Sequence, residues 1–156
     1  MSDRNSIPPG PQATTITTCG DLALSKPAGW VDKSMVILSA PPVDGKFPPS
    51  VVINRATLPK DHSTSDYAEL CAKDGAEEFD GFELLDSDPA SVDGGTAPAF
   101  RFRWDSPRGR ATHRQVYLPG SEGTVLCVTL TSLPHSEAAT EPLFERLLAS
   151  IQAGAE

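Results

Sequence analysis

The segment AFRFRWD, residues 99–105, constrains the fold more than any other feature of this chain. Apolar and charged side chains alternate along it, and successive side chains of a β-strand point to opposite faces of a sheet. The pattern predicts a strand with Phe100, Phe102 and Trp104 on one face and Arg101 and Arg103 on the other. The two faces of this strand therefore have different surroundings.

Two more strands are expected directly after this one. The residues SPRG at 106–109 favour a tight turn, and Pro119-Gly120 favours a second one. Between and after these turns lie RATHRQVYLPG (110–120) and GTVLCVTLTS (123–132), which have the composition of strands. Because the connections are short, the three strands are expected to form an antiparallel meander.

The rest of the chain predicts further strands and two helices. Strands are expected in DLALS (21–25), SMVILSA (34–40) and SVVINRATL (50–58), and the last two are continuous apolar runs typical of strands buried on both faces. A helix is expected over 63–79, capped by Ser65, and a second one over 141–152.

This order of elements predicts an α+β fold. We expect a largely antiparallel sheet of about six or seven strands flanked by two main helices. Residues 1–13 offer almost nothing to bury and are expected to form a disordered tail, which leaves residues 14–154 as a single domain.

Composition and charge exclude several classes of function. The 13 lysines and arginines against 21 acids give a net charge of −8, which disfavours binding to nucleic acid. The segment MSDRNSIPPGPQA lacks the apolar core of a signal peptide, and no apolar run reaches the about 18 residues needed to span a bilayer. We therefore expect a cytoplasmic protein that does not itself insert into a membrane.

The residue types that most often carry chemistry are scattered along the sequence. No spacing typical of a zinc site, a nucleotide-binding loop or a nucleophile elbow is present. The histidines are expected to be solvated or hydrogen-bonded, and two of the cysteines to be buried as small apolar residues. We therefore predict that the chain is not an enzyme and binds no cofactor or metal. The residues concerned are His62, His113, His135, Cys19, Cys71 and Cys127.

Arginine is concentrated in residues 99–114, which contain five of the 13 basic residues and only one of the 21 acids. In one interpretation Arg101, Arg103 and Arg114 are the solvated side of a half-buried hairpin, where exposed ion pairs contribute little. In the other they form a cationic surface that binds an acidic protein or small ligand through planar guanidinium donors. The sequence leaves both interpretations open.

The size of the predicted sheet suggests a binding partner. Six or seven strands spaced by about 4.8 Å form a sheet roughly 30 Å wide, whereas two helices side by side cover about 20 Å of one face. The runs MVIL, VVI and VLCVTL supply apolar side chains to both faces. Either a partner covers the remaining apolar surface, or the helices divide between the faces and loops cover the rest.

Four segments carry a further signal: in chain order they are KPAGWVDKSMVIL, DYAELCAKDGAEEFDGFELL, HRQVYLPGSEGTVLCVTLT and LFERLLASI. Together they extend over about residues 15 to 152, and in this order they resemble the DcrB-like family. The resemblance implies the PsbP-like fold, an antiparallel sheet flanked by helices. Members of this size without a signal peptide resemble Eag-type chaperones of bacterial type VI secretion. These are cytoplasmic, usually dimeric proteins that hold the N-terminal transmembrane helices of a toxic effector until it is loaded on the secretion spike.

The resemblance also implies a set of client-binding residues on matching strands. Asn54 and Gln115 would be polar groups that hydrogen-bond within an apolar surface, although Asn54 also fits a solvated polar position on the sheet. Arginine is an unusual lining for membrane helices, so we expect Arg101, Arg103 and Arg114 to lie at the rim of the site. A dimer seam is the alternative for Arg101 and Arg103. The client-binding set is Leu22, Leu24, Val36, Leu38, Asn54 and Gln115.

One feature departs from the family pattern. Asp74 and Gly75 interrupt the first helix where the family tends to be apolar, and glycine lowers helix propensity. We therefore expect this helix to be short or frayed.

Overall fold

The computed structural model describes residues 14–18, 22–30, 33–42, 44–121 and 123–151. The chain forms two compact units, Met1–Ser34 and Met35–Glu156, and each is described by itself. The predicted tail at residues 1–13 and Cys19 lie outside the described residues.

The first unit contains an antiparallel hairpin of β1 (Thr14–Thr18) and β2 (Leu22–Lys26). Both Leu22 and Leu24 therefore belong to a strand, as predicted. A turn follows, in which the Trp30 backbone N–H donates to the Pro27 carbonyl at 3.2 Å.

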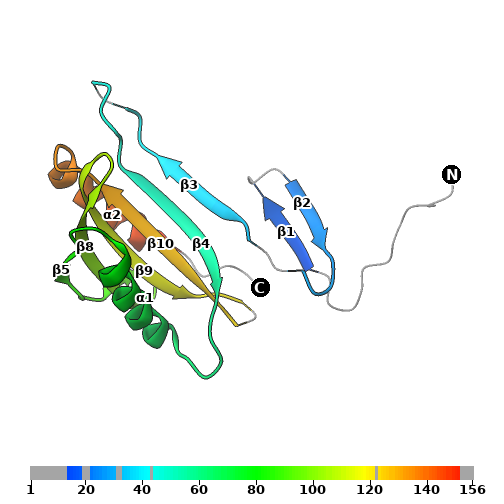
Figure 1. The fold of residues 1–156 in the computed structure, drawn as a ribbon. Helices are drawn as coiled ribbons and strands as arrows, with labels where there is room; N and C mark the ends of the chain where they lie inside the picture. The colour runs from blue at the N-terminus through cyan, green and yellow to red at the C-terminus, as the bar shows by residue number, and fades with distance from the viewer. Residues whose placement is uncertain (1–13, 19–21, 31–32, 43, 122, 152–156) are drawn as a thin grey trace. The chain divides into compact units, whose positions relative to one another are not determined.

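The second unit is built on a six-stranded sheet with the order β3-β4-β10-β9-β8-β5, in which all neighbours are antiparallel (Figure 1). A separate two-stranded ribbon is formed by β6 (Ala90–Val92) and β7 (Gly95–Ala97). Together with two helices this confirms the predicted α+β class. The strands of the large sheet are β3 (Met35–Ser39), β4 (Ser50–Thr57), β5 (Glu83–Asp86), β8 (Ala99–Ser106), β9 (Gly109–Pro119) and β10 (Thr124–Ser132).

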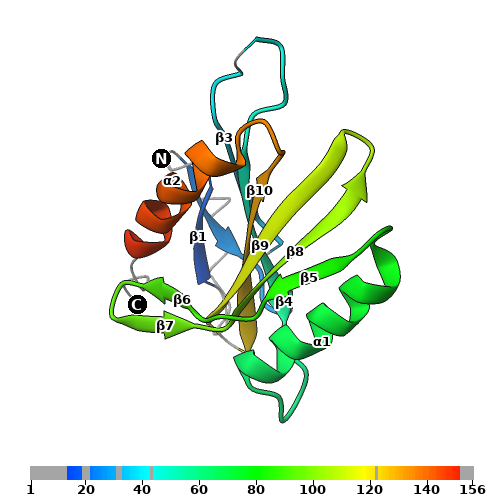
Figure 2. The same cartoon turned by 90° about the vertical axis from the view of Figure 1, so that its left-hand side faces the viewer.

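The two helices, α1 (Thr64–Glu78) and α2 (Glu137–Ala149), pack on opposite faces of the sheet (Figures 1 and 2). Helix α2 packs against Val116 of β9, whereas α1 packs against its neighbour Tyr117. Consecutive strand residues point to opposite faces, so the helices divide between the two faces. We call these surfaces the α1 face and the α2 face.

Helix α1 begins at a complete capping box. The Ser63 hydroxyl accepts a hydrogen bond from the Asp66 backbone N–H at 3.1 Å, and the Asp66 carboxylate accepts one from the Ser63 N–H at 2.9 Å. The predicted cap at Ser65 is therefore wrong by two residues. The reason is that Asp66 supplies the carboxylate that the capping box needs three residues after the cap.

The predicted interruption of α1 at Asp74 and Gly75 is also wrong, because the helix continues to Glu78. Gly75 is buried, and a β-carbon there would lie 3.3 Å from the Phe79 ring and 3.5 Å from the Phe82 ring. The missing side chain thus makes room for two aromatic rings, and this packing offsets the low helix propensity of glycine.

Aromatic rings fill the α1 face beneath the helix. Phe102 is fully buried, with its ring centroid 5.1 Å from that of Phe79, 5.0 Å from that of Phe82 and 5.6 Å from that of Phe100. This is the side on which the alternating pattern placed Phe100, Phe102 and Trp104, and the turn joins Ser106 to Gly109 as predicted. The prediction for this hairpin is confirmed.

The arginines lie on the α2 face, opposite a row of glutamates one helical turn apart on α2. Arg103 pairs with Glu137 at 3.0 Å, Arg101 pairs with Glu141 at 3.4 Å, and Arg114 pairs with Glu145. Residues four apart on a helix share one side of it, which aligns the three acids with the sheet. Each of these three arginines therefore forms an ion pair with a glutamate of the same chain.

Strand β3 differs from its prediction. The continuous apolar run at 34–40 predicted a strand buried on both faces, but all five residues of β3 are exposed. The reason is its position: β3 lies at one edge of the sheet, and among the described residues it pairs with β4 alone.

Candidate functional site

The α1 face has an uncovered part between helix α1 and the β3 edge. Directly opposed residues of antiparallel strands lie on the same face, so the register gives the order of side chains across the sheet. We call this surface the open patch. It consists of Met35, Ile37, Val52, Asn54, Gln115 and Thr129.

Two rows of side chains cross the open patch. In the first row Ile37 lies beside Val52, which lies beside Thr129 and then Gln115. In the second row Met35 lies beside Asn54, which lies beside Cys127 of β10. Both rows begin with an apolar side chain on β3. Their amide and hydroxyl groups lie on β4, β10 and β9.

The β3 side chains of the open patch are the most exposed part of it. Met35 is 55% exposed and Ile37 is 64% exposed, whereas Val52 and Asn54 are half-buried. Exposed apolar side chains that adjoin one another, as Met35 and Ile37 do on β3, indicate an interaction surface better than scattered ones do.

The structure separates the predicted client-binding residues of the second unit into two groups. Asn54 and Gln115 lie on the α1 face within the open patch. Val36 and Leu38 oppose Ile53 and Val51 on the α2 face, with exposures of 49% and 51%. The predicted residues therefore do not share one face of the sheet.

The predicted site residues do not include Met35, Ile37, Val52 or Thr129 of the open patch. The alternation within each strand already placed Val52 on the same face as Asn54. Which β3 residues join them depends on the register of β3 against β4, and nothing local in the sequence sets that register.

Gln115 is held by a neighbour on its own strand. The Tyr117 hydroxyl donates a hydrogen bond of 2.6 Å to Gln115 Oε1. Tyr117 is only 1% exposed, and burial together with the nearby Cys71 thiol raises the pKa of its hydroxyl. The hydroxyl therefore remains protonated and available as a donor.

The two described cysteines lie where α1 meets the sheet. Cys71 and Cys127 are free thiols that pack against the same aromatic cluster as Tyr117. Burial, with a smaller effect of Cys71, raises the pKa of Cys127 to about 11. Cys127 is therefore a protonated side chain with low nucleophilicity.

Each histidine forms a hydrogen bond, as expected. His62 Nδ1 lies 2.9 Å from the Lys60 carbonyl oxygen, and His135 Nε2 lies 3.1 Å from the Phe47 carbonyl oxygen. His113 Nε2 accepts from the Trp104 indole N–H at 3.0 Å. Burial lowers the pKa of His113 to about 4, so this ring is neutral near pH 7.

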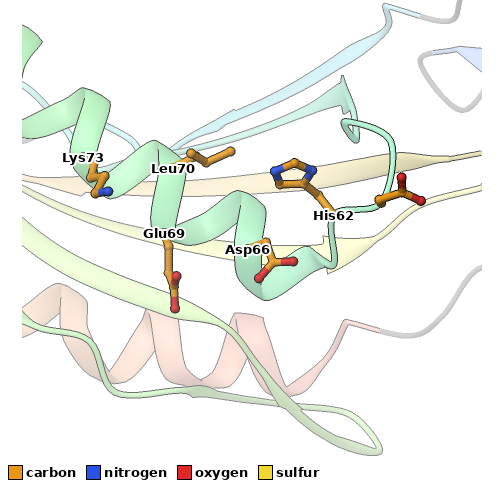
Figure 3. Close-up of a pocket in the computed structure, with 6 residues that line it drawn as sticks. His62, Asp66, Glu69, Leu70 and Lys73 are labelled. Atoms are coloured by element: carbon orange, nitrogen blue, oxygen red, sulfur yellow. The ribbon is translucent and has the colours of Figure 1, made fainter.

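A shallow cavity of about 250 Å³ lies at the start of α1 (Figure 3). Its side chains do not converge, since Glu69 points away from His62 and Leu70. Among the described residues no group of three or more histidines, cysteines or acids is placed to hold a metal ion. The cavity is lined by Asp61, His62, Asp66, Glu69, Leu70 and Lys73.

Within the described part of the chain, no helix is both long enough and apolar enough to cross a bilayer.

The fold defines a small α+β domain whose edge strand β3 exposes apolar side chains, with the polar groups of the open patch beside those on the α1 face. The DcrB family model matches residues 20–150, so the chain belongs to the DcrB family. Among curated proteins, no sequence matches this chain.

Solved structures show the same fold in another protein. A Pseudomonas aeruginosa protein of unknown function has a TM-score of 0.80 at 22% identity, over 92% of this chain and 99% of that protein. LpqN of Mycobacterium tuberculosis, described as involved in cell envelope biogenesis, has a TM-score of 0.45 at 15% identity, over 90% and 88%. The PsbP protein of Synechocystis has a TM-score of 0.46 at 11% identity, over 85% and 87%.

Proposed function

We propose that this chain is a cytoplasmic chaperone of a type VI secretion effector. It binds the N-terminal transmembrane helices of the effector through the open patch and keeps them out of water until the effector is loaded on the secretion spike. The observation that carries the proposal is the pair of exposed side chains Met35 and Ile37 beside the half-buried Val52 and Asn54. The family resemblance supplies the class of client.

The physical requirements of such a client match this surface. A transmembrane segment exposes about 20 apolar residues and aggregates in water unless another apolar surface covers it. An α-helix is about 10–12 Å in diameter, whereas β3, β4, β10 and β9 together span about 15–20 Å. The open patch is thus wide enough to hold one helix.

Polar groups within this surface suit recognition. Asn54 and Gln115 contribute amides that gain a partner on binding and disfavour a client that offers none. This gives a preferred position to a helix that an entirely apolar surface would bind in many registers.

The working unit in this proposal is a homodimer, as the resemblance implies. Two copies provide two open patches for an effector with more than one transmembrane helix. Light scattering on the purified chain measures the mass, which we expect to be twice that of the 16.5 kDa monomer.

The alternative, a binding module for acidic proteins, is less well supported. It requires free arginines, yet Arg101, Arg103 and Arg114 each pair with a glutamate of α2. An acidic ligand would have to displace these acids.

The test compares the two faces of one exposed strand. The full chain is co-expressed with the tagged N-terminal segment of the effector encoded beside it, and co-purification is measured. We expect Met35→Asp with Ile37→Asp to abolish capture, because two charges then lie in the apolar surface. Val36→Asp with Leu38→Asp is the matched control on the same strand and should retain capture.

The control pair also tests the predicted residues on the other face. Loss of capture only in the Val36 and Leu38 variant would move the site to the α2 face. Capture by both variants would refute a client site on β3. A third variant, Leu22→Asp with Leu24→Asp, tests the hairpin of the first unit in the same assay.

A further inference from the structure

Met35 is the one side chain of the open patch whose polarity an oxidant can change. The other five members carry aliphatic, amide or hydroxyl groups, which peroxides leave unchanged, whereas a thioether is oxidised to a sulfoxide. The chain has two methionines, and Met1 lies outside the described residues. The patch therefore contains a single oxidisable group.

The position of Met35 leaves its thioether accessible. The side chain is 55% exposed, and among the described residues β3 pairs with β4 alone, so its other edge is open. A small oxidant therefore reaches the sulfur without any opening of the fold.

The other described sulfur atoms are less accessible. Cys71 and Cys127 are half-buried and pack against the aromatic cluster beneath α1. Burial raises the pKa of Cys127 to about 11, whereas oxidants attack the thiolate form. Met35 is thus the most exposed sulfur-containing residue in the described part of the chain.

Oxidation of Met35 would change the surface that a client meets. Met35 lies beside Asn54 in the strand register and on the same face as Ile37, which is 64% exposed. A sulfoxide oxygen in this place is hydrated while the patch is empty and loses its water beneath an apolar helix, which costs free energy. The oxidised patch therefore suits an apolar client less well than the reduced patch does.

We propose that Met35 is an oxidation site through which peroxides control the open patch, because the thioether permits binding of an apolar helix and the sulfoxide weakens it. The inference rests on the proposed function, since it concerns the regulation of the same surface.

The chemical step is a two-electron oxidation of the Met35 sulfur. The sulfur attacks one peroxide oxygen, so that an S–O bond forms and the O–O bond breaks. The departing hydroxide takes the proton of the new S–OH group and leaves as water. Sulfur is oxidised and the peroxide is reduced, and methionine sulfoxide reductases reverse the change.

The test measures the affinity of the full chain for a lysine-flanked transmembrane peptide of leucine and alanine, before and after treatment with hydrogen peroxide. Fluorescence titration in dilute detergent gives the dissociation constants, and peptide mapping by mass spectrometry shows which residues have gained oxygen. We expect the chain oxidised at Met35 to bind about 5- to 30-fold more weakly, and the reductases to restore the affinity. The thermal unfolding midpoint should not change, because the side chain is exposed.

Two variants separate Met35 from the other sulfur atoms. Met35→Leu keeps a similar size and apolar character without sulfur, so it should bind like the untreated wild type, and peroxide should not weaken it. Met35→Gln places an oxygen at the same position without any oxidant and should bind about as weakly as the oxidised chain.

Three results would overturn the inference and still leave a helix-binding patch. These are no gain of oxygen at Met35, unchanged affinity of the chain oxidised there, and an equal loss of affinity in peroxide-treated Met35→Leu. Absence of peptide binding by the untreated chain would instead refute the proposed function and the inference with it.

Discussion

The two ends of the sheet differ in how they are covered. At the β8–β9 end, α1 packs on aromatic rings on one face and α2 pairs its glutamates with arginines on the other. At the β3–β4 end, β3 is exposed on both faces and Val52 and Asn54 are half-buried. Covered strands stabilise the fold, and uncovered apolar strands are free to bind a partner.

The largest expected difference between the two ends is the loss of stability when a large side chain is replaced by alanine. Phe102→Ala removes a fully buried ring in contact with four other rings and should lower the free energy of unfolding by about 3–5 kcal/mol. Ile37→Ala, at 64% exposure, should change it by less than about 0.5 kcal/mol. Urea unfolding monitored by circular dichroism measures both. Equal losses would mean that β3 is a structural strand and not a binding surface.

A smaller loss of stability is expected when the pH is lowered, and it arises at the β8–β9 end of the sheet. The pKa of His113 is lowered to about 4 in the folded chain, whereas an unfolded histidine has a pKa near 6.5. The unfolded state therefore binds a proton first, so stability is lost as pH falls from about 6.5 to 4. Between pH 7 and pH 5 the loss from this ring is about 2 kcal/mol.

The control for acid is His113→Gln, which keeps an acceptor for the Trp104 indole but does not titrate. The difference in unfolding free energy between wild type and this variant should shrink or invert as pH falls. A difference independent of pH between 7 and 5 would show that His113 does not titrate differently in the two states.

The smallest effect concerns the α2 face. Glu145→Ala leaves Arg114, whose side chain is 10% exposed, without its carboxylate and should lower stability by about 1 kcal/mol, because Glu145 itself is half exposed. Glu77→Ala, an exposed acid of α1, is the matched control and should have an effect below about 0.5 kcal/mol. If the two losses were alike, the ion pairs would not hold α2 to the sheet.

The sequence predicted those features that depend on local periodicity. Alternation at 99–105 placed Phe102 and Arg103 on opposite faces, because a strand has a period of two. The partner of Arg103 could not be predicted, because Glu137 lies 34 residues away in the sequence. The two side chains come into contact only if α2 packs on the face of the sheet that carries Arg103. The same limit applied to β3, because an apolar run does not reveal whether its strand lies at the centre or at the edge.

Only part of the candidate site could be predicted, because the pairing of strands is not a local feature of the sequence. Asn54 and Gln115 were named through the family resemblance, and the register places both in the open patch. Val36 and Leu38 were named on the same basis, but one residue of difference along a strand changes the face. Only the pairing of β3 with β4 identifies Met35 and Ile37 as the side chains beside Asn54 and Val52.

The central claim is that the α1 side of β3 binds an apolar helix. Hydroxyl-radical footprinting of the full chain, with and without a lysine-flanked transmembrane peptide of leucine and alanine, tests it most directly. It reports side-chain exposure residue by residue, and methionine, isoleucine and leucine all react. We predict that the peptide protects Met35 and Ile37 while Leu38, on the other face of the same strand, keeps its reactivity. Protection of Leu38 with Met35 and Ile37 unprotected, or no change at any of the three, would contradict it.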